Sequence, residues 1–479
     1  MSCHAFQVRS WRQFFAIDEI ETSRFLQTVY WVLLFGFYLS FEDWISSPVV
    51  TRSAAQAGRH VCPPYFQNCE WLYFFDGWPH SYGQSTFYAL LATLLSLSAI
   101  FALRKQWTYA HIFMVPAFLW KVIYVMVLTY KAGADFEYFH IPEVFVFLFV
   151  RNKAFFVRRV FVLIYVLSAT VRFSATWVVG GYFTTLQGGL PFVSDIWVPV
   201  FTNAVTVFEI VSPWLLLSHS RRVRYSIVGL WTVFHLYSII LVHFRFPAQC
   251  VPLLWALFLP DPPPEERKFS WSAPVNWRGW VFFATLFFLA LVPRLTFEER
   301  LYTLQAKKFG VNMMGANYQC ISEETSIPKK GDPIHRSHVS TAAMRRCDPY
   351  PIWFRLKQAC THYVLERLEW RLHVSVNGEP FYRTVDTRNV CAIAYSAFGA
   401  NTWIRGPEEG APIVGYPGPN YPLKTEASQD KPTIFPTPQL HKTALQRWLH
   451  AHLDFFVWTY WLLWSGVALV FLRGFVRSH

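Results

Sequence analysis

Long apolar runs alternate with short polar connections along most of this chain. A helix needs about 20 apolar residues to cross the hydrocarbon core of a bilayer. The longer runs are therefore predicted to be membrane helices: Phe25–Leu39, Phe87–Leu103, Ile112–Tyr130, Phe156–Thr176, Val198–Leu217, Tyr225–Val242, Val281–Val292 and Phe455–Leu472. Two shorter runs, Ile141–Val150 and Cys250–Leu259, are predicted to be half-helices or tilted helices buried in protein.

Basic residues fall at every second connection between these runs. They are Arg104/Lys105, Arg151 to Arg159, Arg221/Arg222/Arg224, Lys268 and Arg473/Arg477. If both shorter runs cross and the N-terminus is cytoplasmic, every basic group lies in the cytoplasm, as the positive-inside rule requires. Snorkelling at helix ends would explain why these side chains lie near helix ends, but it would not explain the alternation.

The composition agrees with a membrane protein. Charged residues make up 15% of the chain and hydrophobic residues 53%, with a mean hydropathy of +0.23, whereas soluble domains carry about 25% charged residues. The net charge of +13 lies mostly in short loops beside apolar runs, with no basic stripe of the kind that binds nucleic acid. Nucleic-acid binding is therefore not expected.

The predicted fold is mainly α: a polytopic membrane helix bundle of about nine or ten segments with a small β-rich extracytoplasmic domain. The predicted divisions are a cytoplasmic N-terminal segment (1–24), a transmembrane bundle (25–295), the extracytoplasmic domain (296–447), and a C-terminal helix with a basic cytoplasmic tail (448–479). Pro, Gly and charged residues return after residue 300, as expected where a chain leaves lipid.

Six cysteines lie on the predicted outer side: Cys62, Cys69, Cys320, Cys347, Cys360 and Cys391. An even set there predicts disulfides formed in an oxidising compartment. Cys62–Cys69 is one expected bond, and the other four supply one or two more in a connectivity that spacing alone leaves open. The spacing matches no zinc pattern, so no metal site is expected.

The extracytoplasmic domain is predicted to contain a β-hairpin over 370–385. Leu372, Val374 and Val376 alternate with polar neighbours, and Asn377-Gly378 is typical of a tight hairpin turn. A further strand is predicted at Val390–Tyr395. No phosphate loop or Ser-His-Asp spacing occurs in this domain, so a structural or binding role is favoured over catalysis.

Several ionisable residues lie at membrane depth, where they are costly and are functional candidates. Lys121, Glu143, Glu209 and His235 lie within predicted spans, and Arg172, His243 and Arg245 lie near outer ends. Such residues could form a buried polar network around a cavity, and Lys121, Glu209 and His235 are expected to be inward-facing, mutually satisfied polar groups. Arg172, His243 and Arg245 could instead bind lipid headgroups at the interface.

One stretch resembles a known family. Val171-Arg172-Phe173-Ser174-Ala175-Thr176-Trp177, followed by Gly180-Gly181-Tyr182, is similar to the signature of the vitamin K-dependent γ-glutamyl carboxylases, whose membrane fold is called the HTTM domain. Phe14-Phe15 with Ile17-Asp18 and Arg24, Phe139-His140, and Phe234-His235-Leu236 resemble other parts of that family in order and spacing. The resemblance covers roughly residues 10–295.

At one position this chain differs from the family that it resembles. The resemblance implies a catalytic lysine five residues before the Trp, and this position is Arg172. A guanidinium has a pKa of about 12 or more, so its neutral form is not available as a base, although it can bind an anionic or quinone oxygen. Candidate ligand-binding or lipid-binding residues are Arg172, Trp177, Tyr182, His140, Glu209, His235 and Arg245.

These observations favour a carboxylase-like membrane protein without carboxylase activity, acting as an accessory or scaffold subunit of a membrane complex, with a quinone or lipid as possible ligand. Its expected partners are membrane lipids and other integral membrane proteins. A second interpretation is a quinol-dependent enzyme in which Lys121, Lys131 or His235 replaces the missing base. A third is a transporter, because half-length runs resemble broken helices. A bacterial inner membrane with a periplasmic domain is favoured, and an endoplasmic reticulum membrane is the alternative.

Overall fold

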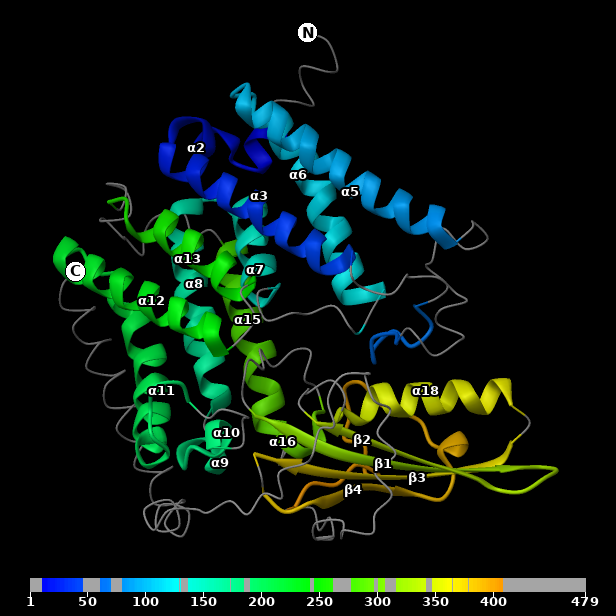
Figure 1. Cartoon of the computed structure of the whole chain (residues 1–479). Helices are drawn as coiled ribbons and strands as arrows, with labels where there is room; N and C mark the ends of the chain where they lie inside the picture. The colour runs from blue at the N-terminus through cyan, green and yellow to red at the C-terminus, as the bar shows by residue number, and fades with distance from the viewer. Residues whose placement is uncertain are drawn as a thin grey trace.

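The molecule consists of a helical part and a smaller sheet domain (Figure 1). The computed structural model describes the following residues: 11–45, 61–69, 80–128, 130, 137–172, 174–184, 190–241, 245–261, 277–296, 300–305, 316–341, 347–363, 365–377 and 379–407. The predicted span Phe455–Leu472 and the domain boundary at residue 447 lie outside these ranges.

Each predicted apolar run within the described residues contains a helix. The principal helices are α2 (Ile17–Thr22), α3 (Arg24–Ile45), α5 (His80–Leu103), α6 (Trp107–Val122) with its π-helical continuation η2 (Ile123–Leu128), α7 (Glu137–Phe149), α8 (Lys153–Ala169), α11 (Val198–Leu215), α12 (Arg221–Leu241), α13 (Arg245–Phe258) and α15 (Trp277–Thr296). The predicted half-length runs correspond to α7 and α13, which each contain an internal proline.

Three of the described helical stretches are long and apolar enough to cross a membrane: Trp107–Val127, Asp195–Leu215 and Arg221–Ile240. Shorter apolar stretches occur at Ala89–Leu103, Phe139–Phe149, Phe246–Phe258 and Trp277–Ala290. The chain is thus mostly helical with a small antiparallel sheet and helices suited to a membrane. The number of nine or ten membrane segments stays a prediction.

The predicted helix over 156–176 is wrong at its C-terminal end. Helix α8 stops at Ala169, and the chain continues as the short helices η3 (Thr170–Arg172), α9 (Ala175–Val178) and α10 (Gly181–Thr184). The Ser168 and Thr170 hydroxyls donate to the carbonyls of Tyr165 (2.8 Å) and Leu167 (2.7 Å). Such back-bonding competes with the regular helical hydrogen bonds and favours a tighter last turn.

The core of the helical part is built around α7 and α8. Phe139 of α7 lies 4.6 Å from Tyr165 and 5.5 Å from Phe246 between ring centroids. A glycine allows α3 to approach this region closely, because a Cβ at Gly36 would lie 2.4 Å from His140 Nε2 and 2.5 Å from Gln249 Oε1. Three helices thus meet at polar side chains inside an apolar core.

The sheet domain has four antiparallel strands in the order β2-β1-β3-β4. The strands are β1 (Tyr318–Pro328), β2 (Ile334–Thr341), β3 (Leu365–Val376) and β4 (Tyr382–Thr387). Helix α18 (Pro349–His362) lies against the sheet on the side of the helical part (Figure 1). The predicted hairpin is confirmed as β3 paired with β4, with Leu372, Val374 and Val376 buried and Asn377 at a φ of 51° in the turn.

The predicted strand at Val390–Tyr395 is wrong. Residues Val390–Ala392 form a 3-10 helix, η6, because the Asn389 side chain accepts a hydrogen bond from the Cys391 backbone nitrogen at 3.1 Å. Cys391 is also bonded to Cys360 of α18. This side-chain hydrogen bond and the disulfide to α18 take the place of the predicted strand pairing.

All six cysteines predicted to form disulfides do so. The bonds are Cys62–Cys69, Cys320–Cys347 and Cys360–Cys391. The first bond closes the loop before α5 on itself, and a hydrogen bond from the Tyr350 hydroxyl of α18 to the Cys62 carbonyl, at 2.7 Å, connects this loop to the sheet domain. The loop, the sheet and the outer end of α6 therefore share one buried core.

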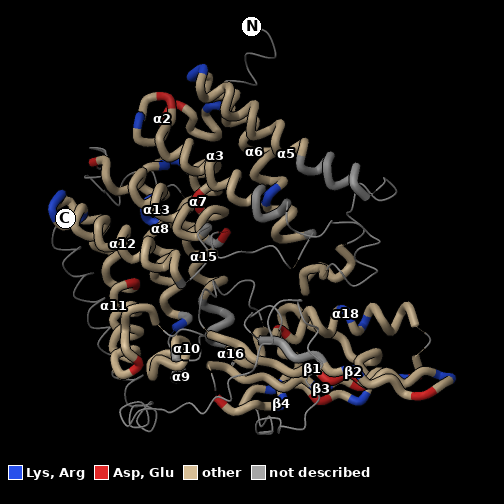
Figure 2. Tube along the Cα trace, in the orientation of Figure 1, with Lys and Arg blue, Asp and Glu red and all other residues tan. Residues whose placement is uncertain are grey.

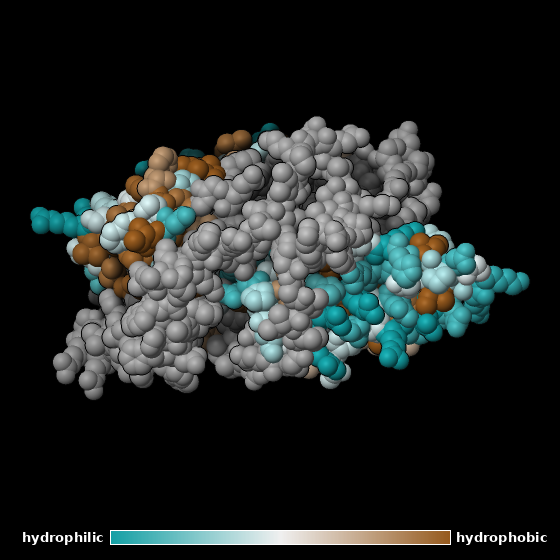
Figure 3. All heavy atoms as spheres, turned by 60° about the horizontal axis from the view of Figure 1, so that its bottom comes forward, coloured by the Kyte–Doolittle hydropathy of each residue, from teal (hydrophilic) through white to brown (hydrophobic). Residues whose placement is uncertain are grey.

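Charge and hydropathy are distributed unevenly over the molecule. Within the helical part, Lys and Arg gather at the end of α5 and the beginning of α12, on the side away from the sheet, whereas the sheet domain carries Lys and Arg mixed with Asp and Glu (Figure 2). Apolar side chains gather over the helices at the left of Figure 3, whereas polar side chains cover the sheet domain at the right. The sheet domain thus has the surface of a water-exposed domain and lies opposite the basic side.

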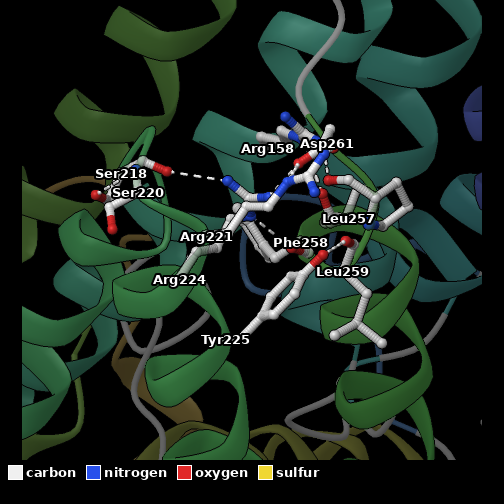
Figure 4. Close-up of polar contacts among 11 residues, drawn as sticks. Arg158, Ser218, Ser220, Arg221, Arg224, Tyr225, Leu257, Phe258, Leu259 and Asp261 are labelled. Carbon is white, nitrogen blue, oxygen red and sulfur yellow. Dashed lines mark hydrogen bonds and ion pairs between the residues drawn. The ribbon is translucent and has the colours of Figure 1, made fainter.

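Arginines hold the C-terminal end of α13 on this basic side (Figure 4). Arg158 donates to the Leu257 carbonyl at 2.7 Å, and Arg224 donates to the Phe258 carbonyl at 2.9 Å. Arg221 and Arg224 also pair with Asp261, and the hydrogen bond from Arg221 is the main reason why the pKa of Asp261 is lowered. Cations at a helix C-terminus satisfy its last carbonyls and its dipole, so this contact fixes α8, α12 and α13 together.

The Cys360–Cys391 bond should stabilise the sheet domain measurably. The Cys360→Ser/Cys391→Ser variant is expected to lose about 3 kcal/mol in free energy of unfolding, because the bond closes a loop of 31 residues. Denaturation of the detergent-solubilised chain measures the loss. Under a thiol reductant the variant and the wild type should become equally stable, and a difference that persists would contradict the assignment.

Candidate functional site

A cavity of about 550 Å³ lies among α8, α11 and α12. Its wall is mostly aliphatic and aromatic, with Val205 and Phe208 from α11, Val233 and Phe234 from α12, and Phe246 from α13. A cavity of this size and character is typical of a site for an apolar small molecule.

A buried ion pair lies in this apolar wall. Arg172, in the irregular segment after α8, pairs with Glu209 in the middle of α11, and the two side chains are 6% and 4% exposed. The Arg172 guanidinium lies 5.1 Å from the centre of the Trp177 ring. Because α8 ends at Ala169, the chain turns here and brings Arg172 against α11.

Trp177 is fixed in place behind the arginine. Its indole nitrogen donates to Thr206 Oγ1 at 3.0 Å, and its ring lies 5.3 Å from that of Tyr182 and 5.6 Å from that of Phe183. An arginine held between a carboxylate and an aromatic face keeps its charge and its orientation. The wall can thus present a permanent cation and hydrogen-bond donors to a polar group of a ligand.

A second polar feature of the wall is Tyr165 of α8. Its hydroxyl lies 2.5 Å from His235 Nε2 of α12, which is buried behind the wall. A tyrosine whose hydroxyl donates a hydrogen bond to a neutral imidazole can accept a proton from a ligand at its phenol oxygen while it passes its own proton to the imidazole. The cavity therefore combines a fixed cation with a site capable of proton exchange.

Lys121 is buried elsewhere, in a satisfied cluster. Its ammonium donates to Ser40 Oγ at 2.7 Å, to Glu137 Oε2 at 2.6 Å and to His140 Nδ1. His140 Nε2 lies 2.7 Å from the Leu33 carbonyl and donates to it. An ammonium has three donors, so these contacts use all of them. Neither Lys121 nor His140 lines the cavity.

The structure thus divides the candidate residues. Arg172, Trp177 and Glu209 line the cavity, Tyr182 packs on Trp177, and His235 reaches the cavity through Tyr165. Arg245 begins α13, but its side chain lies outside the described residues, as do Lys131 and His243. Within the described part of the chain, no group of three or more His, Cys, Asp or Glu residues is placed to hold a metal ion.

Sequence reasoning did not identify Tyr165 as part of this site. A tyrosine within an apolar, aromatic-rich helix gives no signal of its own, since 23 tyrosines occur in the chain. One signal was available: Tyr165 lies seven residues before Arg172, and residues seven apart lie on the same face of a helix. Comparisons with protein-family models, curated proteins and solved structures found no match to the chain.

Breaking the Arg172–Glu209 pair should be costly, because one partner would remain as a buried unpaired charge. Glu209→Gln is expected to lower the free energy of unfolding by about 3–5 kcal/mol, and Arg172→Met/Glu209→Met should regain most of that loss. Denaturation in mixed micelles measures both variants. As a control, Asp195→Asn removes an exposed carboxylate and should change stability by no more than about 0.5 kcal/mol. A double variant as unstable as Glu209→Gln would contradict this account.

Proposed function

We propose that this chain is a membrane protein that binds an amphipathic molecule, a quinone or a lipid, in the cavity between α8, α11 and α12. The observation that carries the proposal is the buried Arg172–Glu209 pair in the wall of an otherwise apolar cavity. An apolar tail would pack against the aromatic wall, and a polar head would accept hydrogen bonds from the guanidinium.

We further propose a carboxylase-like (HTTM) fold without the carboxylase reaction. The position of the family's catalytic lysine is occupied by Arg172, whose guanidinium cannot act as a base. Its pairing with Glu209 supports a binding role, because a salt-bridged guanidinium stays charged. The protein would then act by holding a ligand, not by carboxylating a substrate.

An accessory or scaffold role in a membrane complex is proposed for the same molecule. Large apolar side chains that do not line the cavity are exposed on α11 and α12, among them Val200, Trp214, Leu236, Ile239 and Ile240. Such faces pack against lipid or against other membrane helices. Membrane lipids and integral membrane proteins are the partners that this surface would accept.

The proposed orientation places the basic side in the cytoplasm and the disulfide-bonded sheet domain outside. The gathering of Lys and Arg away from the sheet supports this orientation, and three disulfides support an oxidising compartment around the sheet domain (Figure 2). A multi-pass protein of a bacterial inner membrane is favoured, with the sheet domain in the periplasm. The endoplasmic reticulum membrane is the alternative host.

A second candidate function is a quinol-dependent carboxylase-like enzyme with a substitute base. The contact between Tyr165 and His235 favours His235 in that role, because it connects an imidazole to the cavity wall. Lys121 is less suited to it, since its donors are engaged by Ser40, Glu137 and His140 away from the wall.

Filling the cavity should abolish ligand binding without disturbing the fold. Val205→Trp places a bulky ring in the wall, so the purified variant should lose any isoprenoid quinone or lipid that copurifies with the wild type. Extraction followed by mass spectrometry measures the bound molecules. Val207→Trp is the matched control, because Val207 lies on the same helix, is 36% exposed and does not line the cavity. Equal ligand content in both variants would contradict the proposed binding site.

An incorporation assay separates the two candidate functions. With reduced quinone, labelled bicarbonate and glutamate peptides, the wild-type chain is expected to incorporate no label, because Arg172 cannot deprotonate a quinol. Arg172→Lys serves as the comparison, since it restores the residue type that the family resemblance implies. Label incorporated by the wild type and lost in His235→Gln would establish the enzymatic alternative.

A further inference from the structure

Positive charge is in excess at the C-terminal end of α13. The guanidiniums of Arg158, Arg221 and Arg224 converge on this helix end, where Asp261 supplies the carboxylate among the described residues (Figure 4). Arg158 and Arg224 are buried, and they donate mainly to main-chain carbonyls. One carboxylate and the negative end of the helix dipole balance only part of three cations, which leaves a net charge of about +1.5.

Arg221 is the accessible member of this cluster. Its side chain is 67% exposed, compared with 2% for that of Arg224. It donates to both oxygens of Asp261, through Nε and Nη2. A guanidinium binds a phosphate in the same bidentate way as a carboxylate. Arg221 is therefore placed to hold a phosphate that reaches it from the surface.

A notch in the surface lies beside this cluster, between α12 and α13. At one end of the notch, the Tyr225 hydroxyl donates to the Leu259 carbonyl at 3.0 Å. At the other end, the Trp255 indole nitrogen donates to Thr232 Oγ1 at 2.9 Å. Gly229 lies between these contacts on α12, and a Cβ there would meet no described atom within 4 Å. The missing side chain leaves open space between the two contacts, and we call this surface the α12–α13 notch.

The walls of the notch are mostly apolar and face outward. Tyr225, Trp255 and Leu259 are 44%, 45% and 43% exposed. Tyr and Trp at such positions are typical of the boundary between the headgroups and the hydrocarbon of a bilayer. Gly229 follows Arg221 on the same helix at a distance of about 12 Å along the axis. A phosphate on Arg221 would thus place the first part of an acyl chain over the notch.

Helix α12 separates the notch from the cavity. Leu230 and Val233 of this helix line the cavity, whereas Tyr225, Gly229 and Thr232 do not. A molecule in the notch therefore lies outside the cavity.

We propose that the α12–α13 notch binds an anionic phospholipid, with the phosphate on Arg221 and an acyl chain across Gly229. The inference rests on the proposed membrane function, but it does not require a ligand in the cavity. Charge selects this occupant, because a negatively charged lipid complements the positive cluster and a zwitterionic lipid does not. Free phosphate would leave the apolar walls of the notch uncovered.

Asp261 acts as an internal competitor for the lipid phosphate. Its carboxylate occupies the donors of Arg221 that a phosphate would use, and it also contacts Arg224 at 2.8 Å. A phosphate can therefore take Arg221 while Asp261 stays on Arg224. Removal of the Arg221 charge should weaken lipid binding, and removal of the Asp261 charge should strengthen it. A cluster that only holds the helices together would show neither change.

The test measures lipid affinity with the full chain in nonionic detergent micelles. Phosphatidylglycerol and phosphatidylcholine are titrated separately into the delipidated chain, and native mass spectrometry gives an apparent Kd for each. Arg221→Gln should weaken phosphatidylglycerol binding about fivefold and Asp261→Asn should tighten it about fivefold, which is the effect of one charge near an anionic lipid. Phosphatidylcholine binding should be unchanged in both variants.

A variant in the notch tests where the lipid lies. Gly229→Trp puts a ring into the notch and should weaken phosphatidylglycerol binding about tenfold, because it excludes roughly two methylene groups. Val223→Trp is the matched control on α12, since Val223 is 38% exposed and lines neither the notch nor the cavity. Arg104→Gln is the control for charge, because Arg104 is exposed and directly follows α5 on the same basic side. Both controls should bind as the wild type does.

Two results on charge would overturn the site. Equal losses of affinity in Arg221→Gln and Arg104→Gln would indicate a diffuse effect of charge. Displacement of phosphatidylglycerol by inorganic phosphate at equal concentration would indicate an anion site without an acyl chain. A wild type that does not prefer phosphatidylglycerol over phosphatidylcholine overturns the site as well, and it leaves the cavity proposal standing.

Two results on position distinguish the notch from other places and occupants. Val205→Trp is expected to retain phosphatidylglycerol. Loss of this lipid in Val205→Trp but not in Gly229→Trp would place it in the cavity, which supports the proposed function and overturns the notch. A wild-type dimer that Gly229→Trp dissociates, with unchanged lipid content, would assign the notch to a second copy of this chain and overturn the lipid site.

Discussion

The helical part depends on one constraint: polar groups placed in an apolar, water-poor interior must satisfy one another. Each buried charge here illustrates it. Lys121 is engaged by three side chains, and Arg172 is paired with Glu209. Arg224 donates to the Phe258 carbonyl at the C-terminal end of α13, where a cation is favourable. Because an unpaired buried charge costs several kcal/mol, these contacts restrict how the helices can pack.

The same constraint separates a structural cluster from a functional one. Around Lys121, every donor has an acceptor, and Gly36 lets the helices approach closely enough to make the cluster compact. Beside Tyr165, which lines the cavity, His235 Nδ1 has no hydrogen-bond partner among the described residues. Polar groups that are left with unused capacity can interact with a ligand or a proton, whereas satisfied ones mainly stabilise the fold.

The sheet domain follows a different physical rule, because it is exposed to water. Three disulfides supplement its core: one closes the loop before α5, one joins β1 to the chain just before α18, and one joins α18 to η6. Small domains with little apolar core gain much of their stability from such cross-links. The contact between Tyr350 and Cys62 then fixes the loop before α5 to this domain.

The features that depend on neighbouring residues could be predicted from the amino-acid sequence. The apolar runs predicted helices, and the apolar alternation before Asn377 predicted the hairpin, because periodicity and turn chemistry act over a few residues. The six cysteines of the predicted outer side likewise predicted disulfides. Other features became visible only in the folded molecule: the end of α8 at Ala169, the contact of Arg172 with Glu209 beside a cavity, the position of Lys121 away from that cavity, and the contact of Tyr165 in the wall with His235. Those outcomes depend on how helices distant in the chain rotate and pack against one another, and a single sequence does not encode that in any local pattern.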